Sequence, residues 1–172
     1  MSNVAAIQLD IKQAEAYASF LQTAPEIAEQ EMAVSLNEAL LLLEREVKER
    51  TPVGVGGGGG LRGSITSELR GRQTANLHGR VFSPLAHALP VELGTKPHWA
   101  PIDPIQDWVE VKLGIPKSES RSVAFMVARK IARKGTEGAH MFENAFSDNT
   151  TQVLRLLNAG IDRLFARLGG GG

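Results

Sequence analysis

Apolar side chains recur every three or four residues in the first third of the chain, which is typical of an amphipathic helix. This stripe consists of Ala33 and four larger residues, Leu36, Leu40, Leu43 and Val47. Thr23 and Pro25 suit a helix cap and a first turn, and Thr51 ends the helix because it precedes Pro52. The pattern predicts a long helix over residues 22–50. The weak alternation over residues 4–20 leaves a short strand and a loose arm both open.

A glycine-rich segment, residues 51–60, separates this helix from two apolar runs that favour strands. The runs cover residues 61–68 and 77–83, and the polar stretch 70–74 joins them, so we expect a long antiparallel hairpin with a loose tip. The glycine segment has no side chains to bury and is expected to form a mobile loop. Four prolines then predict loops and turns, so that residues 61–101 together form the hairpin and proline-rich part.

The last part, residues 102–168, is predicted to be helical. One helix follows Asp103-Pro104 and stops at Gly114, and a second begins at Ser118 or Ser120 and stops at Gly135. A third begins near Asp148 or Asn149 and carries an apolar stripe of Val153, Leu157, Ile161, Leu164 and Leu168. Residues 169–172 are four glycines and are expected to be a flexible tail. We therefore predict a single α+β domain: the long helix on a small antiparallel sheet with an extended hairpin, covered by C-terminal helices.

The formal net charge of zero hides an uneven distribution of charge along the 172 residues. Residues 1–50 hold nine acidic and four basic side chains, whereas residues 51–140 carry a net positive charge. This predicts either two surfaces of opposite sign, which suits head-to-tail assembly of copies, or an acidic helix face beside an ordinary basic loop region. A neutral total argues against a general nucleic-acid coat. The chain also lacks cysteine, a signal-peptide pattern and an apolar run long enough to span a membrane.

No motif for catalysis or cofactor binding is found in a suitable setting. Residues 54–59 match the letters of a dinucleotide fingerprint, but a helix precedes them and a strand follows, the reverse of what that site needs. The four histidines lack metal-ligand spacing, and no serine lies in a nucleophile elbow. We therefore predict no enzyme activity, no cofactor and no metal site.

Two basic groups and two tryptophans are the remaining candidates for contact with partners. Two interpretations are open for each basic group: contact with phosphates, or a basic rim of the surface that is exposed to solvent. The hairpin group is Arg62, Arg70, Arg72 and Arg80, and the second, at a helix end, is Arg129, Lys130, Arg133 and Lys134. Trp99 and Trp108 pin their proline-rich segment to the core or form an interface, and we favour the core.

Three short motifs, in order, resemble a family of phage tail-completion or head–tail joining (neck) proteins of long-tailed double-stranded-DNA phages. The first is TPVG at residues 51–54 with LRGSI at 61–65, and the second is ALPVELGT at 88–95. The third is RKGT at 133–136 with MFENAF at 141–146. Two features depart from the family pattern, because the glycine run lengthens the first motif and residues 102–134 are longer than in compact members.

The resemblance implies a structural virion protein of the neck or tail, assembled in the host cytoplasm. It would complete the tail and join it to the DNA-filled head as a ring, with six copies favoured, in contact with other neck and tail proteins. Within the second motif, Glu92 is expected to accept amide hydrogen bonds, and Gly94 before Thr95 to supply the backbone conformation of a tight turn. The alternatives are a minor tail-tube component away from the neck and a DNA-contacting protein that lines a channel.

Overall fold

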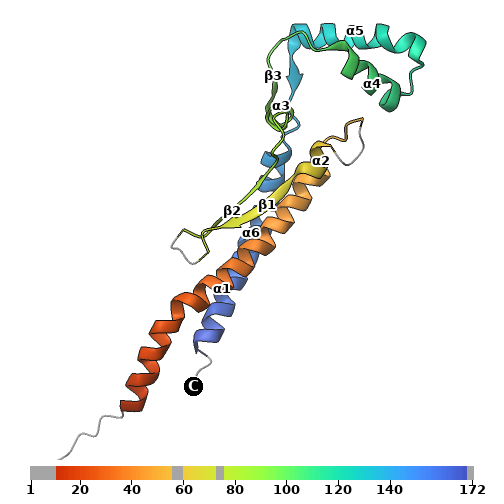
Figure 1. The fold of residues 1–172 in the computed structure, drawn as a ribbon. Coiled ribbons are helices and arrows are strands. Elements are labelled where there is room, and N and C mark those ends of the chain that lie inside the picture. The colour runs from red at the N-terminus through yellow and green to blue at the C-terminus, as the bar shows by residue number, and fades with distance from the viewer. Residues whose placement is uncertain (1–10, 56–59, 73–75, 170–172) are drawn as a thin grey trace, which may run out of the picture.

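A computed structural model describes residues 11–55, 60–72 and 76–169, with side chains of the first helix from residue 24 onwards. The chain folds into an elongated α+β structure, as predicted (Figure 1). Helix α1 (Ile11–Arg50) runs along most of the molecule. The predicted end at Arg50 is confirmed, but the predicted start is wrong, because Pro25 lies inside the helix. Residues 11–22 include three Ala and two Gln, with one each of Lys, Glu and Leu, and these good helix formers extend the helix past the proline.

Helix α6 (Met141–Gly169) lies antiparallel beside α1. At one end of the pair Arg50 contacts Asp148, and at the other Arg163 contacts Glu31. Next to the Arg163 contact, the helices approach so closely that a Cβ on Gly160 would overlap the hydroxyl of Ser35. The predicted start at Asp148 or Asn149 is wrong by about two turns, for a reason given with Glu92 below.

The predicted hairpin is confirmed and packs across α1. Strands β1 (Thr66–Arg70) and β2 (His78–Phe82) pair antiparallel, with Thr66 opposite Phe82 and Arg70 opposite His78. Residues 61–64, expected in the first strand, instead form the short helix α2 (Leu61–Ser64). Parts of three predicted flexible regions lie outside the described residues: 73–75 at the hairpin tip, 56–59 in the glycine loop and 170–172 in the tail.

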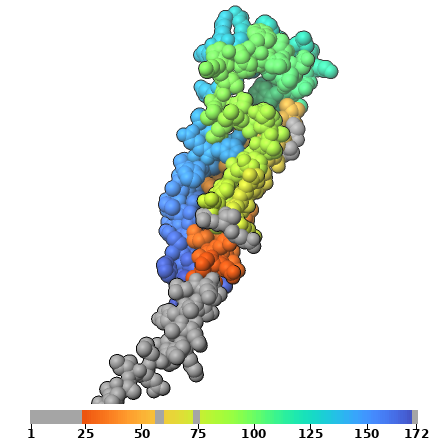
Figure 2. All heavy atoms as spheres, turned by 60° about the vertical axis from the view of Figure 1, so that its left-hand side comes forward, coloured from red at the N-terminus to blue at the C-terminus, as the bar shows by residue number. Residues whose placement is uncertain are grey.

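A short ribbon links this body to a helical hairpin at one end of the molecule (Figures 1 and 2). The ribbon follows α3 (Ala88–Leu93) and pairs β3 (Gly94–Thr95) with β4 (Thr136–Glu137). Between these strands, α4 (Ile102–Leu113) and α5 (Lys117–Lys134) pack chiefly on each other, and we call residues 102–134 the helical arm. Gly114 and Gly135 end these helices as predicted.

The core is thin and lies where α1, α2 and α6 meet. Its buried cluster consists of Val47, Leu61, Ile65, Met141 and Ala145. Of the predicted α1 stripe, Leu40 and Val47 are buried, whereas Leu36 and Leu43 are half-buried. Much apolar surface therefore remains outside the core.

Candidate functional site

The most prominent unexplained feature is the apolar side of α6, which no other described part of the chain covers. Buried residues of this helix are Met141, Ala145 and Gly160, two of which are small. Four large apolar side chains are exposed: Phe146 57%, Leu154 53%, Ile161 38% and Phe165 67%. The other predicted stripe residues, Val153, Leu157, Leu164 and Leu168, are half-buried. Only Ile161 of the predicted stripe is therefore exposed, whereas Phe146, Leu154 and Phe165 lie outside that stripe.

Polar contacts also join α6 to α1. Glu31 accepts from Arg163 Nε at 3.0 Å and from Arg167 at 2.7 Å. The same Arg163 also donates to the hydroxyl of Ser35 at 2.9 Å. These long-range contacts help to fix the rotation of α6 on α1, and in this orientation Phe146, Leu154, Ile161 and Phe165 are exposed.

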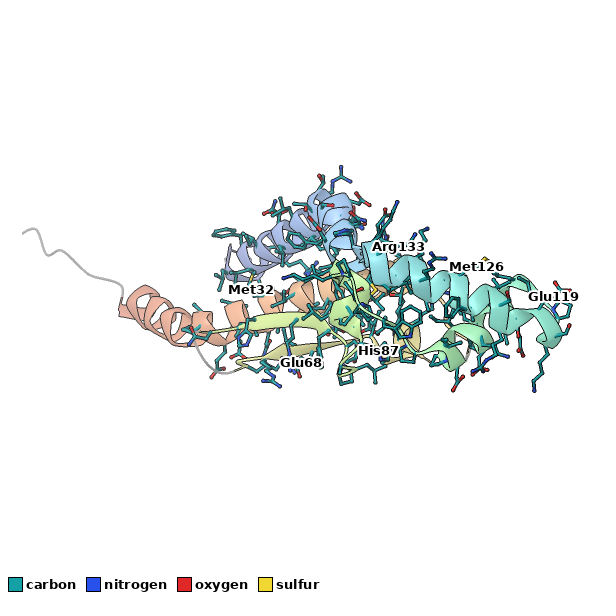
Figure 3. All side chains as sticks on the ribbon, turned by 90° about the horizontal axis from the view of Figure 1, so that it is seen from above. Met32, Glu68, His87, Glu119, Met126 and Arg133 are labelled. Atoms are coloured by element: carbon teal, nitrogen blue, oxygen red, sulfur yellow. The ribbon has the colours of Figure 1, made fainter. Side chains whose placement is uncertain are left out.

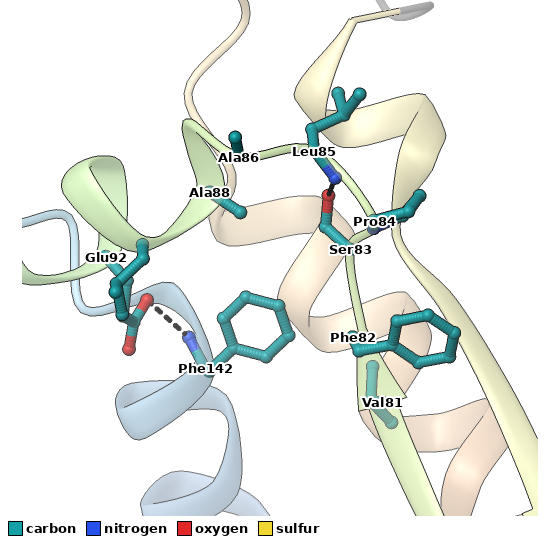
Figure 4. A pocket seen from close by; sticks show the side chains of 10 residues that line it. Val81, Phe82, Ser83, Pro84, Leu85, Ala86, Ala88, Glu92 and Phe142 are labelled. Carbon is teal, nitrogen blue, oxygen red and sulfur yellow. Dashed lines mark hydrogen bonds between the residues drawn. The ribbon is translucent and has the colours of Figure 1, made fainter.

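A groove continues this apolar surface at the start of α6 (Figure 4). It has a volume of about 490 Å³ and lies between the end of β2, α3 and α6. Its lining is mostly apolar, including Val81, Leu85, Leu89 and Phe142. Phe146 lies four residues after Phe142 and so shares its helix face. We call the groove together with the exposed α6 residues Phe146, Leu154, Ile161 and Phe165 the α6 surface.

Glu92 caps the start of α6 and forms one edge of the groove. Its two carboxylate oxygens accept from the backbone amides of Phe142 at 3.0 Å and Glu143 at 3.1 Å. The expected amide hydrogen bonds are therefore present, but they come from α6 and not from the turn at Gly94. A carboxylate satisfies first-turn amides and interacts favourably with the helix dipole. Since this cap lies fifty residues earlier in sequence, no local signal marks Met141 as the helix start.

Gly94 and Thr95 hold the β3–β4 ribbon together. Gly94 has φ 77° and ψ −177°, and a Cβ there would overlap the carbonyl oxygen of Thr136. Thr95 and Thr136 share a hydrogen bond between their hydroxyls at 2.9 Å. The expectation that Gly94 supplies an unusual backbone conformation is confirmed. An interface role for these residues stays a prediction.

Three of the four hairpin arginines are engaged within the chain. Arg62 donates to the carbonyls of Glu49 at 3.1 Å and Thr51 at 3.2 Å, which ties α2 to the end of α1. Arg70 and Arg80 both form ion pairs with Glu68, and Arg80 also lies over the ring of Phe82. Arg72 is exposed. The hairpin thus offers less free positive charge than its sequence indicates.

Neither tryptophan lies in the core, so the favoured interpretation of both is wrong. Trp99 is 54% exposed and Trp108 is 39% exposed. Trp99 packs edge-on against Phe125 of α5, with ring centroids 5.6 Å apart. Both tryptophans belong to the helical arm or the segment leading into it, where the described structure lays no further element over them.

The acidic charge of α1 is largely neutralised within the chain. Arg167 and Arg163 lower the pKa of Glu31 through hydrogen bonds. Arg50 and Arg45 in the same way lower the pKa of Glu46 to about 2. Two opposite surfaces and an acidic helix face beside a basic region both stay predictions. Among the basic side chains that have no acidic partner within the described chain are four neighbours on α5: Arg129, Lys130, Arg133 and Lys134.

We expect the Glu46 interactions to make stability depend on pH in acid. Its pKa is lower in the folded chain than the ordinary value of 4.5, so the folded state favours the ionised form. This contribution is complete above pH 4.5 and is lost as the pH falls towards about 2. Melting temperatures measured at pH 7, 4.5 and 2.5 should therefore fall less steeply for Glu46→Gln than for the wild type. Equal slopes would contradict the assignment, and Glu26→Gln serves as a control at an exposed position of the same helix.

Comparison with family models, curated proteins and solved structures found no match. Over the described residues, no group of three or more histidine or acidic side chains is placed to hold a metal ion. In the same part of the chain no helix is both long and apolar enough to cross a membrane. Sequence reasoning had missed the α6 surface. Its stripe was recognised, but nothing in the periodicity says whether a stripe is covered.

Proposed function

We propose that this chain is a structural virion protein of the phage neck, which completes the tail and joins it to the DNA-filled head as a ring. The observation that carries the proposal is the α6 surface, an apolar face along a 29-residue helix that its own fold leaves open. In this role the chain binds partners and catalyses no reaction. The three motifs of the sequence resemblance support the neck in particular, and with it a ring of six copies.

The extent of exposed surface supports an assembly role. The accessible surface is 12075 Å² for 18.5 kDa, whereas a compact monomer of that mass exposes about 8,200 Å². Exposed contiguous apolar surface of this kind typically marks a protein interface. A ring joins two different surfaces of adjacent copies, so we expect the α6 surface to pack on another face of the next copy.

The segments that carry the resemblance lie around one end of the α6 surface, which supports a shared role in assembly. Leu61 and Ile65 of the first motif and Met141 and Ala145 of the third belong to one core cluster. Glu92 of the second motif caps the helix that begins at Met141. A neighbour that binds the α6 surface would thus rest on the part of the fold that these motifs build.

Imaging of virions tests the proposal directly. Cryo-electron microscopy of intact particles should show this chain as a ring between the head and the tail. Density along the tail tube would instead favour the minor tail-tube alternative, and absence from both places would overturn a virion role.

Charge placed on the α6 surface should weaken self-association without unfolding the chain. We expect Leu154→Glu/Phe165→Glu to raise the dissociation constant of the oligomer at least tenfold, because two exposed apolar contacts are replaced by buried charges. Sedimentation velocity over a range of concentrations measures this change. Val111→Glu/Leu113→Glu removes two comparably exposed apolar residues from α4 and should leave association within about twofold. Equal loss in both variants would argue against the α6 surface as the interface.

A further inference from the structure

The outer face of α5 carries two parallel rows of exposed side chains. Residues four apart lie above one another on a helix, separated by about 6 Å along its axis. One row is Phe125, Arg129 and Arg133, and the other is Met126, Lys130 and Lys134. The side chains from Met126 onwards border a shallow hollow of about 340 Å³. Figure 3 shows Met126 and Arg133 along the length of this helix.

All four basic side chains of these rows are free of intramolecular partners. The described chain places no carboxylate within ion-pair distance of Arg129, Lys130, Arg133 or Lys134, although it pairs Arg50, Arg163 and Arg167. The dipole of α5 accounts for Arg133 and Lys134 in the last turn, where cations are favoured. It does not account for Arg129 and Lys130, because the effect fades within one turn. The cluster is therefore larger than helix stability requires.

The charges around the cluster favour a polyphosphate ligand over another copy of this chain. Three acidic side chains of α1, Glu31, Glu44 and Glu46, each bind a basic residue of their own chain and are less available to a neighbour. A small single anion is also a poor fit, because the negative end of the helix dipole lies beside Lys134. Repeated phosphates along a strand match two rows of cations over about one and a half helical turns.

We propose that the α5 rows bind the phosphate backbone of nucleic acid, with Arg129, Lys130, Arg133 and Lys134 as the contact residues. The half-exposed pair Trp99 and Phe125 lies at the start of one row and gives unpaired bases a surface to stack on. Contacts of this kind position a backbone without reading its sequence. The inference goes beyond the neck role and is measured on the isolated chain, so the outcome of either test does not decide the other.

Fluorescence anisotropy with a labelled 20-base-pair duplex and with its single strand tests the proposal on the full chain. Four phosphate contacts predict that the logarithm of duplex affinity falls with the logarithm of salt with a slope of about −3.6. This corresponds to a loss of about 150-fold between 50 and 200 mM NaCl. Arg129→Gln/Arg133→Gln should bind at least tenfold more weakly at 50 mM, with a slope of about −1.8.

The matched control is Arg70→Gln/Arg72→Gln, which removes the same charge from the hairpin. It should bind within about twofold of the wild type, and circular dichroism should show all three proteins folded. Binding of the duplex or of the single strand supports the site if it depends on Arg129 and Arg133. Whichever of the two nucleic acids binds more tightly identifies the source of the phosphates. Absent binding at 50 mM, or equal loss in the control, overturns it. A third outcome also overturns it: the wild type binds no nucleic acid, and Arg129→Gln/Arg133→Gln dissociates an oligomer. That result assigns the rows to an acidic surface on another copy.

Discussion

Leu40→Asp is expected to prevent folding, whereas Leu41→Asp, one residue further along the same helix, is expected to leave the chain folded. Leu40 is 4% exposed and Leu41 is 55% exposed. Strand β2 lies directly on Leu40, since a Cβ on Gly79 would overlap the end of its side chain. The pair thus separates the effect of burial from the effect of a charge on this helix.

The expected size of the effect follows from two contributions. Loss of a buried leucine side chain costs about 2–5 kcal/mol, and an unpaired carboxylate in its place adds several more. The total is comparable with the whole stability of a domain, about 5–15 kcal/mol. Far-ultraviolet circular dichroism and urea unfolding should show a cooperative transition for Leu41→Asp and none for Leu40→Asp. A folded Leu40→Asp with a similar midpoint would refute the packing of the hairpin on α1.

Gly94→Ala is expected to open the ribbon that joins the helical arm to the rest of the protein. With φ 77° and ψ −177°, Gly94 occupies a backbone region essentially reserved for glycine. An added Cβ would overlap the carbonyl of Thr136 and lie 2.8 Å from the amide of Gly138. Both are backbone atoms that cannot move aside without breaking the β3–β4 pairing. We expect a loss of at least about 3 kcal/mol.

Gly114→Ala is the matched control for this substitution. Gly114 also has a positive φ, 65°, but a Cβ there meets nothing within 4 Å. It should therefore cost only about 1–2 kcal/mol, the price of the left-handed conformation. Hydrogen exchange should show faster exchange of the amides of Ala139 and His140, which donate to α3 carbonyls, in Gly94→Ala alone. Equal protection in the two variants would show that the ribbon tolerates the side chain.

The segment that contains Glu92 and Gly94 contacts both α6 and the ribbon that leads to the helical arm. Gly94 pairs with β4, and two residues earlier Glu92 holds the first turn of α6. The helical arm and the α6 surface thus meet at α3. In an assembly, a neighbour bound to the α6 surface and nucleic acid bound to α5 would act on opposite sides of this short connection.

Local signals predicted most elements well. The α1 stripe, the hairpin and the stops at Gly114 and Gly135 each depend on a few neighbouring residues, and each is confirmed. The errors are at Pro25, at residues 61–64 and at Met141. A proline is a strong local signal for the first turn of a helix. Here the good helix formers before Pro25 outweigh that signal, and the helix begins earlier. The start of α6 depends on a carboxylate from a distant part of the chain, and no window of sequence contains both.

The candidate site was predicted less well than the fold. The four basic residues of α5 and the apolar stripe of α6 were visible in the sequence, but their surroundings were not. Negative charge in α1 left open a separate acidic surface or a solvated helix face, and the sequence did not show that Glu31 pairs with Arg163 and Arg167. The tryptophans were expected in the core, but the arm that carries them has no partner in the described structure.

The sequence by itself determined the fold class, the order of most elements and the presence of one apolar face on each long helix. Periodicity has this power because a helix repeats every 3.6 residues whatever surrounds it. Only the tertiary structure decided which faces are covered. Gly160 and Ser35 allow the close approach of α6 to α1, and Arg163 and Arg167 fix the side that is used. Because those contacts join residues more than a hundred positions apart, no local pattern shows that Phe146, Leu154, Ile161 and Phe165 stay exposed.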